Sequence, residues 1–240
     1  MKKWYSKIRK FFDDDSRKMK QRDVIIVGVL VLFYAILSFW DLGTLTNPQT
    51  SLRFDAAANE ATIQIDNGVT EISKIRHYAG DESGNYILLG SEDGEVYYEI
   101  GRMEQDYEFA WVDTEVIATI QYLKIEAENA GSYLGEIQLY DKYGDKVKAS
   151  GATERSSLLV DESETVPAFI SYQNSAYFDE IYFGRSAYEY VNGMQVIEWV
   201  HPPLGKLIQM IPIFFFGMTT FSYRLMGNIA GILMIPVIYC

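Results

Sequence analysis

Three stretches of the chain are almost wholly apolar. Residues 24–40 (VIIVGVLVLFYAILSFW) form 17 consecutive positions without a charge, close to the roughly 20 that an α-helix needs to cross a hydrocarbon core. Two further apolar stretches, 204–223 and 225–239, are joined at Arg224. The pattern predicts three transmembrane helices, at 24–40, 204–223 and 224–240.

The long stretch between them, residues 41–203, contains short runs of β-branched and aromatic residues that partly alternate with polar ones. Turn signals stand at 66–68, 92–94 and 143–145. This spacing leaves no room for crossover helices and predicts an antiparallel β-sandwich over residues 50–150. The predicted strands are Ala61–Asn67, Tyr86–Gly90, Val96–Ile100, Phe109–Val112, Thr119–Glu126 and Leu134–Tyr140.

The expected fold class is therefore mixed: about three transmembrane α-helices and an inserted extracellular antiparallel β-sandwich. The expected segments are a basic cytosolic tail at 1–23, a first helix at 24–40, the sandwich at 50–150, an exterior loop at 165–203, and helices at 204–223 and 224–240.

Charge is divided unevenly along the 240 residues, whose formal net charge is −12. Residues 1–23 carry nine Lys or Arg against four Asp, whereas residues 41–203 carry ten basic against 29 acidic residues. Short basic flanks stay in the cytosol, so we expect a multi-pass protein of the cell membrane with a cytosolic N-terminus and residues 41–203 outside. Without a basic stripe, this exterior argues against a nucleic-acid partner.

The chain has one cysteine and two histidines. One cysteine rules out an intramolecular disulfide framework and a zinc site of clustered cysteines, and two histidines argue against a His-rich metal centre. We therefore assign no metal ligands. The need for a divalent metal stays open, because sites built only from oxygen ligands leave little spacing signature.

Candidate chemistry gathers before the second apolar stretch. Asp179 and Glu180 are adjacent carboxylates, and Glu198 precedes the segment His201–Lys206 (HPPLGK). Just outside a membrane, one carboxylate could act as a base toward an acceptor hydroxyl while a lysine and an arginine receive a lipid phosphate. Taken alone, such a charge pair more often faces solvent.

This stretch resembles the first exterior loop of the protein O-mannosyltransferases (dolichyl-phosphate-mannose protein mannosyltransferases), polytopic enzymes of the GT-C superfamily. Asp179, Glu180, the segment His201–Lys206 and Arg224 match that family's features in order. The resemblance implies the N-terminal part of an inverting glycosyltransferase. Such an enzyme would move a mannose-like sugar from a polyprenyl-phosphate donor to a protein or glycan hydroxyl on the outer face of the membrane.

The resemblance also implies residue roles. Asp179 would be the catalytic base, Glu180 would position acceptor or base, and Lys206 would lie near the lipid phosphate. Arg224 would be as much structural as catalytic. We expect no other cofactor than the lipid-linked donor itself.

Two features depart from the family's pattern. Glu198 stands three residues before His201 rather than two, and residues 41–178 form an insertion. Glu198 and His201 remain candidates for the lipid-phosphate site, with His201 equally a helix-entry residue. Arg185 could bind phosphate or could pair with Glu189, four residues further along a helix.

The insertion resembles the galactose-binding or discoidin-like sandwiches in its segments around Tyr97, Trp111 and Leu134–Ile137. Tyr97 and Trp111 are candidate glycan-stacking residues, although aromatic side chains in a sandwich more often belong to the core. The alternative function is thus a membrane-anchored extracellular carbohydrate-binding module without catalysis.

The expected partners are a membrane lipid carrier and a protein or glycan acceptor. Because the apolar sequence stops at Cys240, inside the third expected helix, we also expect a missing C-terminal transmembrane part or a second chain that supplies it.

Overall fold

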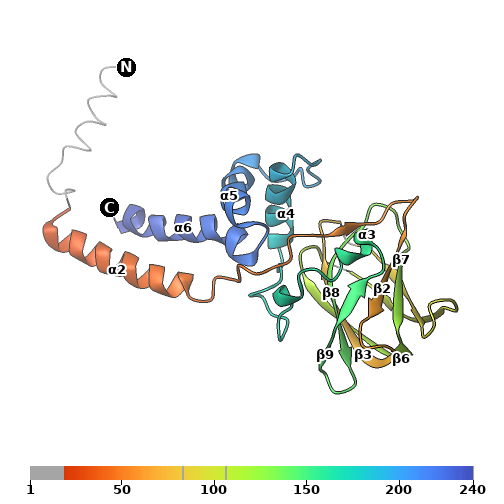
Figure 1. Ribbon diagram of the computed structural model, residues 1–240. Coiled ribbons are helices and arrows are strands. Elements are labelled where there is room, and N and C mark those ends of the chain that lie inside the picture. Colours follow the sequence, from red (N-terminus) through yellow and green to blue (C-terminus); the bar gives the residue numbers. More distant parts are fainter. Residues whose placement is uncertain (1–18, 83, 106, 240) are drawn as a thin grey trace. The chain divides into compact units, whose positions relative to one another are not determined.

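The computed structural model describes residues 19–82, 84–105 and 107–239 of the chain (Figure 1). Most of the predicted cytosolic tail therefore lies outside the described residues. The chain divides into two compact units, residues 43–224 and the remainder, made of residues up to 42 and from 225 onward. Each unit is described by itself.

The described part of residues 43–224 contains ten strands, with helices after them. The strands are β1 (Leu52–Arg53), β2 (Glu60–Ile65), β3 (Thr70–Ala79), β4 (Tyr86–Ser91), β5 (Tyr98–Met103), β6 (Trp111–Ile120), β7 (Tyr122–Ala127), β8 (Tyr133–Asp141), β9 (Lys146–Val147) and β10 (Ala149–Gly151). The helices are α3 (Glu154–Ser157), the 3₁₀ turn η2 (Ser163–Thr165), α4 (Glu180–Val191), α5 (Pro203–Phe216) and the first residues of α6 (Thr220–Tyr239).

The strands form an antiparallel β-sandwich of two sheets, as the sequence predicts. One sheet has the order β1-β8-β3-β6 with β9 on β8, and the other has the order β10-β2-β7-β4-β5. Ile125 of the central strand β7 is opposite Ala61 of β2 and Leu88 of β4. Alternation along these strands directs one row of apolar side chains between the sheets.

The main core lies between the sheets and is made of aliphatic side chains from both. Its fully buried members include Ile63, Ile75, Leu88, Leu123 and Ile125. The chain after the last strand closes this core, because Leu159 is also buried in it. The sandwich therefore extends beyond residue 150, where the sequence pattern ended it.

The strand β3 was not among the predicted strands. Its sequence TEISKIRHYA has a register shift between Ile72 and Lys74 that interrupts the alternation. It also buries Arg76 and His77, residue types that ordinarily mark an exposed position. Arg76 is neutralised by Asp113 of β6, whose carboxylate oxygens lie 2.7 and 2.8 Å from the guanidinium.

A second core joins one end of the sandwich to the helices. Tyr78, Phe109 and Trp111 pack with Ala187 of α4 and with Ile213 of α5. Met218 and Tyr223 complete this core. The sandwich and the helices α4 and α5 thus belong to one packed unit.

The structure divides the apolar sequence after Pro202 differently from the expected helices. The expected helix 204–223 is interrupted at Gly217, whose φ of +74° suits glycine, and a Cβ there would clash with the side-chain oxygen of Gln49. The helix α5 therefore ends at Phe216 and α6 begins at Thr220. As a result Arg224 lies within the first turns of α6 rather than between two helices.

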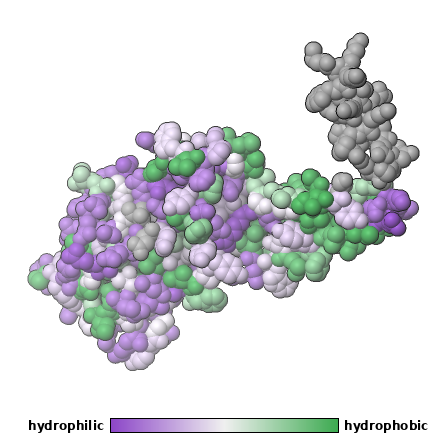
Figure 2. All heavy atoms as spheres, turned by 180° about the vertical axis from the view of Figure 1, so that it is seen from behind, coloured by the Kyte–Doolittle hydropathy of each residue, from purple (hydrophilic) through white to green (hydrophobic). Residues whose placement is uncertain are grey.

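The other unit pairs α2 (Gln21–Phe39) with the rest of α6. The Tyr239 hydroxyl lies 3.5 Å from Asp23 Oδ1, and the Tyr34 hydroxyl lies near Gly231, so the two helices are antiparallel. Among the described residues, α2 and α6 are the helices long and apolar enough to cross a membrane by length and composition. Hydrophobic residues cover them, whereas polar residues predominate over the sandwich (Figure 2).

The central strand β7 provides a test of the core. Replacing Ile125 with alanine should lower the free energy of unfolding by about 2–5 kcal/mol, because it leaves a cavity between the sheets. Urea unfolding of the detergent-solubilised chain measures this loss. The control is Ile117→Ala on β6, where the side chain is 88% exposed and the cost should stay below about 1 kcal/mol. Equal losses in both variants would contradict the assigned core.

Candidate functional site

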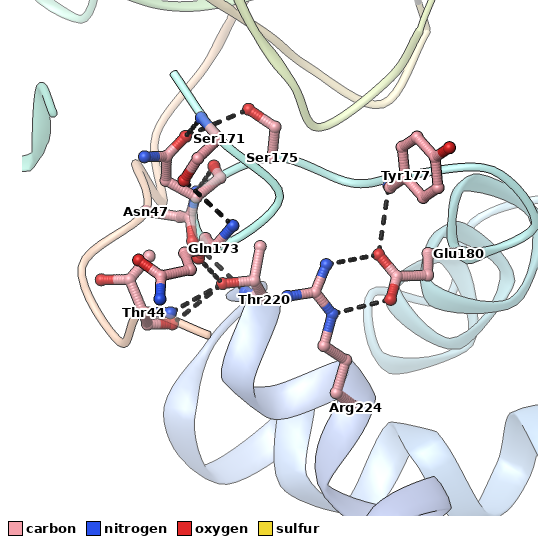
Figure 3. Close-up of polar contacts among 10 residues, drawn as sticks. Thr44, Asn47, Ser171, Gln173, Ser175, Tyr177, Glu180, Thr220 and Arg224 are labelled. Carbon is pink, nitrogen blue, oxygen red and sulfur yellow. Dashed lines mark hydrogen bonds and ion pairs between the residues drawn. The ribbon is translucent and has the colours of Figure 1, made fainter. Parts of the chain in front are cut away.

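The acids predicted to carry chemistry lie where α4, α5 and α6 meet. Glu180, in the first turn of α4, forms a bidentate pair with Arg224 of α6: Arg224 Nε lies 2.7 Å from Oε1 and Nη2 lies 2.6 Å from Oε2 (Figure 3). Glu180 Oε2 also accepts the backbone N–H of Tyr177 at 3.1 Å. Two parallel charge-assisted hydrogen bonds fix this carboxylate in orientation.

The same region fixes the beginning of α6. The Thr220 hydroxyl accepts the N–H of Thr44 at 2.8 Å and donates to the carbonyl of Gln173 at 2.5 Å (Figure 3). The Thr220 N–H donates to Asn47 Oδ1 at 3.3 Å. These contacts satisfy polar groups at the helix start that have no intrahelical partner. Because these contacts fix the beginning of α6, they also fix the position of Arg224 relative to Glu180.

A second carboxylate, Glu198, organises the entry to α5. The Lys206 ammonium donates both to the Glu198 carboxylate and, at 2.9 Å, to the Glu198 carbonyl. Glu198 Oε1 accepts the N–H groups of Val200 and His201 at 2.6 and 3.2 Å. The hydrogen bond from Lys206 lowers the pKa of Glu198 to about 2.

This arrangement changes what Lys206 can do. The sequence predicted a lysine that lies near a lipid phosphate, but Lys206 is only 1% exposed and is occupied by Glu198. His201 stands two residues before α5, and its ring lies 4.9 Å from that of Phe183, as suits a helix-entry residue. In this structure, Lys206 and His201 make contacts that fix the segment leading into α5.

Arg185 is enclosed by carboxylates rather than open to a phosphate. It donates to Glu189 Oε1 at 3.0 Å and to Glu108 Oε1 at 2.7 Å, and Asp81 Oδ1 lies 3.5 Å away. Of the two alternatives for this residue, the structure places it with Glu189. Asp81 and Glu108, which come from loops of the sandwich, were not predicted, since no motif distinguishes them from other loop acids. One guanidinium therefore faces three carboxylates where the sandwich meets α4.

Asp179 differs from these paired acids. It is exposed and precedes α4 without capping it through its side chain. Among the described residues, no hydrogen-bond or ion-pair partner is found for its carboxylate. The preceding residue, Phe178, has a φ of +51°, a conformation that costs energy for a large side chain and recurs at functional sites. Asp179 thus differs from Glu180 and Glu198, whose carboxylates are held in ion pairs.

The two candidate glycan-stacking residues, Trp111 and Tyr97, have different environments in the structure. Trp111 is 3% exposed and packs against Tyr78, with ring centroids 5.0 Å apart. Trp111 is therefore a core residue, and its proposed stacking on a sugar is a misassignment. Its position at the beginning of β6, where the sandwich meets the helices, explains the burial.

Tyr97 instead lines a groove on the sandwich with a volume of about 440 Å³. Tyr122 of β7, which sequence reasoning did not single out, lies on the same groove. Both rings are partly buried, and the Lys124 ammonium lies 4.5 Å from the centroid of Tyr97. The groove is lined by Glu60, Ala61, Thr62, Asp93, Gly94, Tyr97, Tyr122, Ala152 and Thr153.

Within the described ranges, no group of three or more His, Cys, Asp or Glu side chains is placed to hold a metal ion. Glu180, Glu189 and Glu198 instead form ion pairs with Arg224, Arg185 and Lys206 respectively.

Comparisons with known proteins give structural likenesses at low similarity. No family model matches the chain, and no curated protein matches it. The chain is similar to the C-terminal domain of a chitobiase from Bacteroides fragilis, with 18% identity over 36% of this chain and 60% of that domain, at a TM-score of 0.27. It is also similar to CpGH89CBM32-5 from Clostridium perfringens in complex with GalNAc-β-1,3-galactose, with 20% identity over 30% of this chain and 58% of that one, at a TM-score of 0.26.

A family 89 glycoside hydrolase from Clostridium perfringens in complex with PUGNAc shares 18% identity over 63% of this chain and 16% of the hydrolase, at a TM-score of 0.35. This chain therefore covers less than two thirds of each of these three chains. At these TM-scores the likenesses carry no argument about fold or function. The resemblance to mannosyltransferases continues to depend on the sequence motifs.

The enclosed charges around Arg185 make stability depend on pH. Burial raises the pKa of Asp81 from 3.8 to about 6, despite the nearby guanidinium. A raised carboxyl pKa stabilises the folded chain below about pH 4 and loses this contribution as pH rises through about 6. We expect Asp81→Asn to be more stable than the wild type by about 1–3 kcal/mol at pH 7.5.

This difference should shrink toward zero as the pH falls below 4, which urea unfolding across pH 4–8 measures. Glu115→Gln, at an exposed position of β6, is the matched control, and we expect no such trend for it. A constant difference between Asp81→Asn and the wild type at every pH would disprove the charge explanation.

Proposed function

We propose that the β-sandwich binds a carbohydrate in the groove of Tyr97 and Tyr122, on the outer side of a membrane that α2 and α6 cross. The observation that carries this proposal is the pairing of two partly buried aromatic rings with hydrogen-bonding side chains in one groove of about 440 Å³. Ligand pockets typically combine apolar walls with a few polar groups that fix orientation.

The chemistry of the groove suits a sugar. An aromatic ring offers its face to the apolar C–H side of a pyranose, and carboxylates and hydroxyls, which Glu60, Thr62 and Thr153 bring to the lining, are groups that hydrogen-bond sugar hydroxyls. Lys124 lies 3.4 Å from Glu60 and over the Tyr97 ring. It therefore contacts both residues at the edge of the groove.

The membrane assignment is supported by the two apolar helices. At about 1.5 Å per residue, 19 residues of α2 and 20 of α6 reach close to the ~30 Å of a hydrocarbon core. The basic residues that precede α2 favour a cytosolic N-terminus. Because α6 is antiparallel to α2, its C-terminal end then also faces the cytosol, and residues 43–219 lie outside.

Aromatic truncation tests the groove. We expect Tyr97→Ala and Tyr122→Ala each to weaken oligosaccharide binding about 10-fold or more, since a well-placed aromatic contact is worth about 1–3 kcal/mol. The full chain in nanodiscs is first screened on a glycan array, and the best ligand is then titrated calorimetrically. Tyr143→Ala is the control, because Tyr143 is an exposed tyrosine in the β8–β9 turn outside the groove. Binding that all three variants retain would contradict the site, and no binding by the wild type would contradict the function.

A second candidate function is glycosyl transfer, favoured by the exposed carboxylate of Asp179 next to Glu180, which is paired with Arg224. In this proposal, Asp179 takes the proton of an acceptor hydroxyl as its oxygen attacks the anomeric carbon of a polyprenyl-phosphate sugar. The bond from that carbon to the phosphate breaks, and configuration inverts. Glu180 and Arg224 position the beginning of α4 and thereby Asp179.

The second candidate predicts a specific loss. In membranes from cells that express the natural gene product, Asp179→Asn should lower sugar transfer from a radiolabelled polyprenyl-phosphate sugar by about 100-fold or more, as loss of a general base does. Asp145→Asn, in an exposed turn of the sandwich, is the matched control and should transfer normally. Equal transfer by Asp179→Asn and the wild type would refute the base assignment.

A further inference from the structure

The helix α5 is too short to cross a membrane. Its 14 residues, Pro203–Phe216, extend about 21 Å at 1.5 Å per residue, whereas a hydrocarbon core is about 30 Å thick. Its two ends are fixed by proline at the start and by Gly217 at the finish. A longer helix is therefore excluded on both sides.

One face of α5 packs inside its own unit. Lys206 and Ile213 are buried, and Met210 is packed against the core that α4 shares. In Figure 1, α5 lies beside α4. This face is thus already occupied.

The other face of α5 is apolar and has no cover within the described residues. Its exposed side chains are 39–70% accessible and follow the i, i+3, i+4 spacing of one helical stripe. We call them the α5 stripe. The members are Leu204, Leu207, Ile208, Ile211, Phe214 and Phe215.

Both ends of α5 remain attached to the unit that holds the sandwich. Glu198 holds Lys206 near the start, and Gln49 Oε1 accepts the N–H of Met218 at 2.8 Å just after the end. The next helix, α6, begins three residues after Gly217. The C-terminal end of α5 therefore lies within a few residues of a candidate membrane span.

We propose that α5 lies in the membrane interface, parallel to the membrane plane, with the α5 stripe among the lipid acyl chains. This inference rests on the proposed spanning role of α2 and α6. Lipid is the favoured occupant because Lys206, the one charged residue of α5, is buried and paired, so the exposed face carries no charge.

The residues flanking α5 fit the same position. Trp199 and Val200 are strongly exposed before its start, and Phe216 is exposed at its end. Aromatic residues favour the boundary between headgroups and acyl chains, and helices with one apolar face insert about 5–10 Å into that boundary. Such a helix would hold Asp179 and its neighbours at headgroup level.

Spin labels measure this placement directly in the full chain reconstituted in liposomes of phosphatidylcholine and phosphatidylglycerol. Cys240, the single cysteine, is first replaced by serine. Single cysteines then replace Leu204, Leu207, Ile211 or Phe214, and each label is compared for collisions with oxygen and with a water-soluble nickel chelate. We expect all four labels to show a severalfold higher oxygen-to-nickel ratio than a label at Ile117, and to share one shallow depth.

The other outcomes overturn the inference in distinguishable ways. A depth that increases steadily from 204 to 214 means that α5 enters the bilayer end-on. Low collision rates with both reagents mean that protein covers the stripe. Labels that behave like Ile117 place α5 in water, and a label at Leu32 of α2 then decides the cause: if it is deep in lipid, only this inference fails, and if it is also in water, the proposed membrane assignment fails.

Discussion

The packing of α4 against one end of the β-sandwich is the interaction on which the unit of residues 43–224 depends. Tyr78, Phe109 and Trp111 supply the apolar part of this junction, and Arg185 supplies the polar part by contacting Glu108 and Glu189. Removing charges from water is expensive unless they pair. The junction is therefore specific in orientation, because a rotated α4 would leave these carboxylates buried without their cation.

That fixed orientation determines which side chains remain free. With α4 held on the sandwich, Glu180 meets Arg224, and the loop before α5 is folded so that Glu198 meets Lys206. Each ion pair connects a loop or helix end to a neighbouring helix and neutralises one carboxylate. Asp179 is left exposed because it stands one residue before α4, outside both pairs. Both proposed functions thus use parts of one scaffold: the groove lies on its sandwich, and Asp179 lies at its helical end.

Much of the sandwich could be predicted from sequence, and its exceptions have physical causes. In runs such as Tyr122–Ala127 buried and partly buried positions alternate, and the turns at Gly68, Gly94 and Gly144 adopt the positive φ that their glycines favour. The strand β3 escaped prediction because a register shift and the buried Arg76 break its alternation. Pairing partners such as Asp113 are separated along the chain and leave no local signal.

The residues of the site could be predicted from the sequence, but the ion pairs that they form could not. The sequence pointed to Glu180, Glu198, Lys206 and Arg224 as a group, and the structure brings them together as two ion pairs. The expected place of Lys206 near a lipid phosphate followed from the resemblance to the mannosyltransferases, and a sequence motif does not reveal that Lys206 is buried and paired with Glu198. Trp111 was ambiguous for a related reason, because a tryptophan at the beginning of a strand has the same local sequence whether it faces a ligand or a core.

The interruption at Gly217 also changes the membrane topology that charge counting suggests. Three crossings placed Arg224 at the cytosolic face, where the positive-inside rule prefers it. In the proposed topology α5 does not cross, so that α6 is the second crossing of the described chain and begins outside, with Arg224 near its outer end. An unpaired arginine would be disfavoured there, but Glu180 accepts two of its hydrogen bonds. Under that proposal, the ion pair compensates the charge that the topology rule counts, and the contact that positions α4 also permits α6 to run inward.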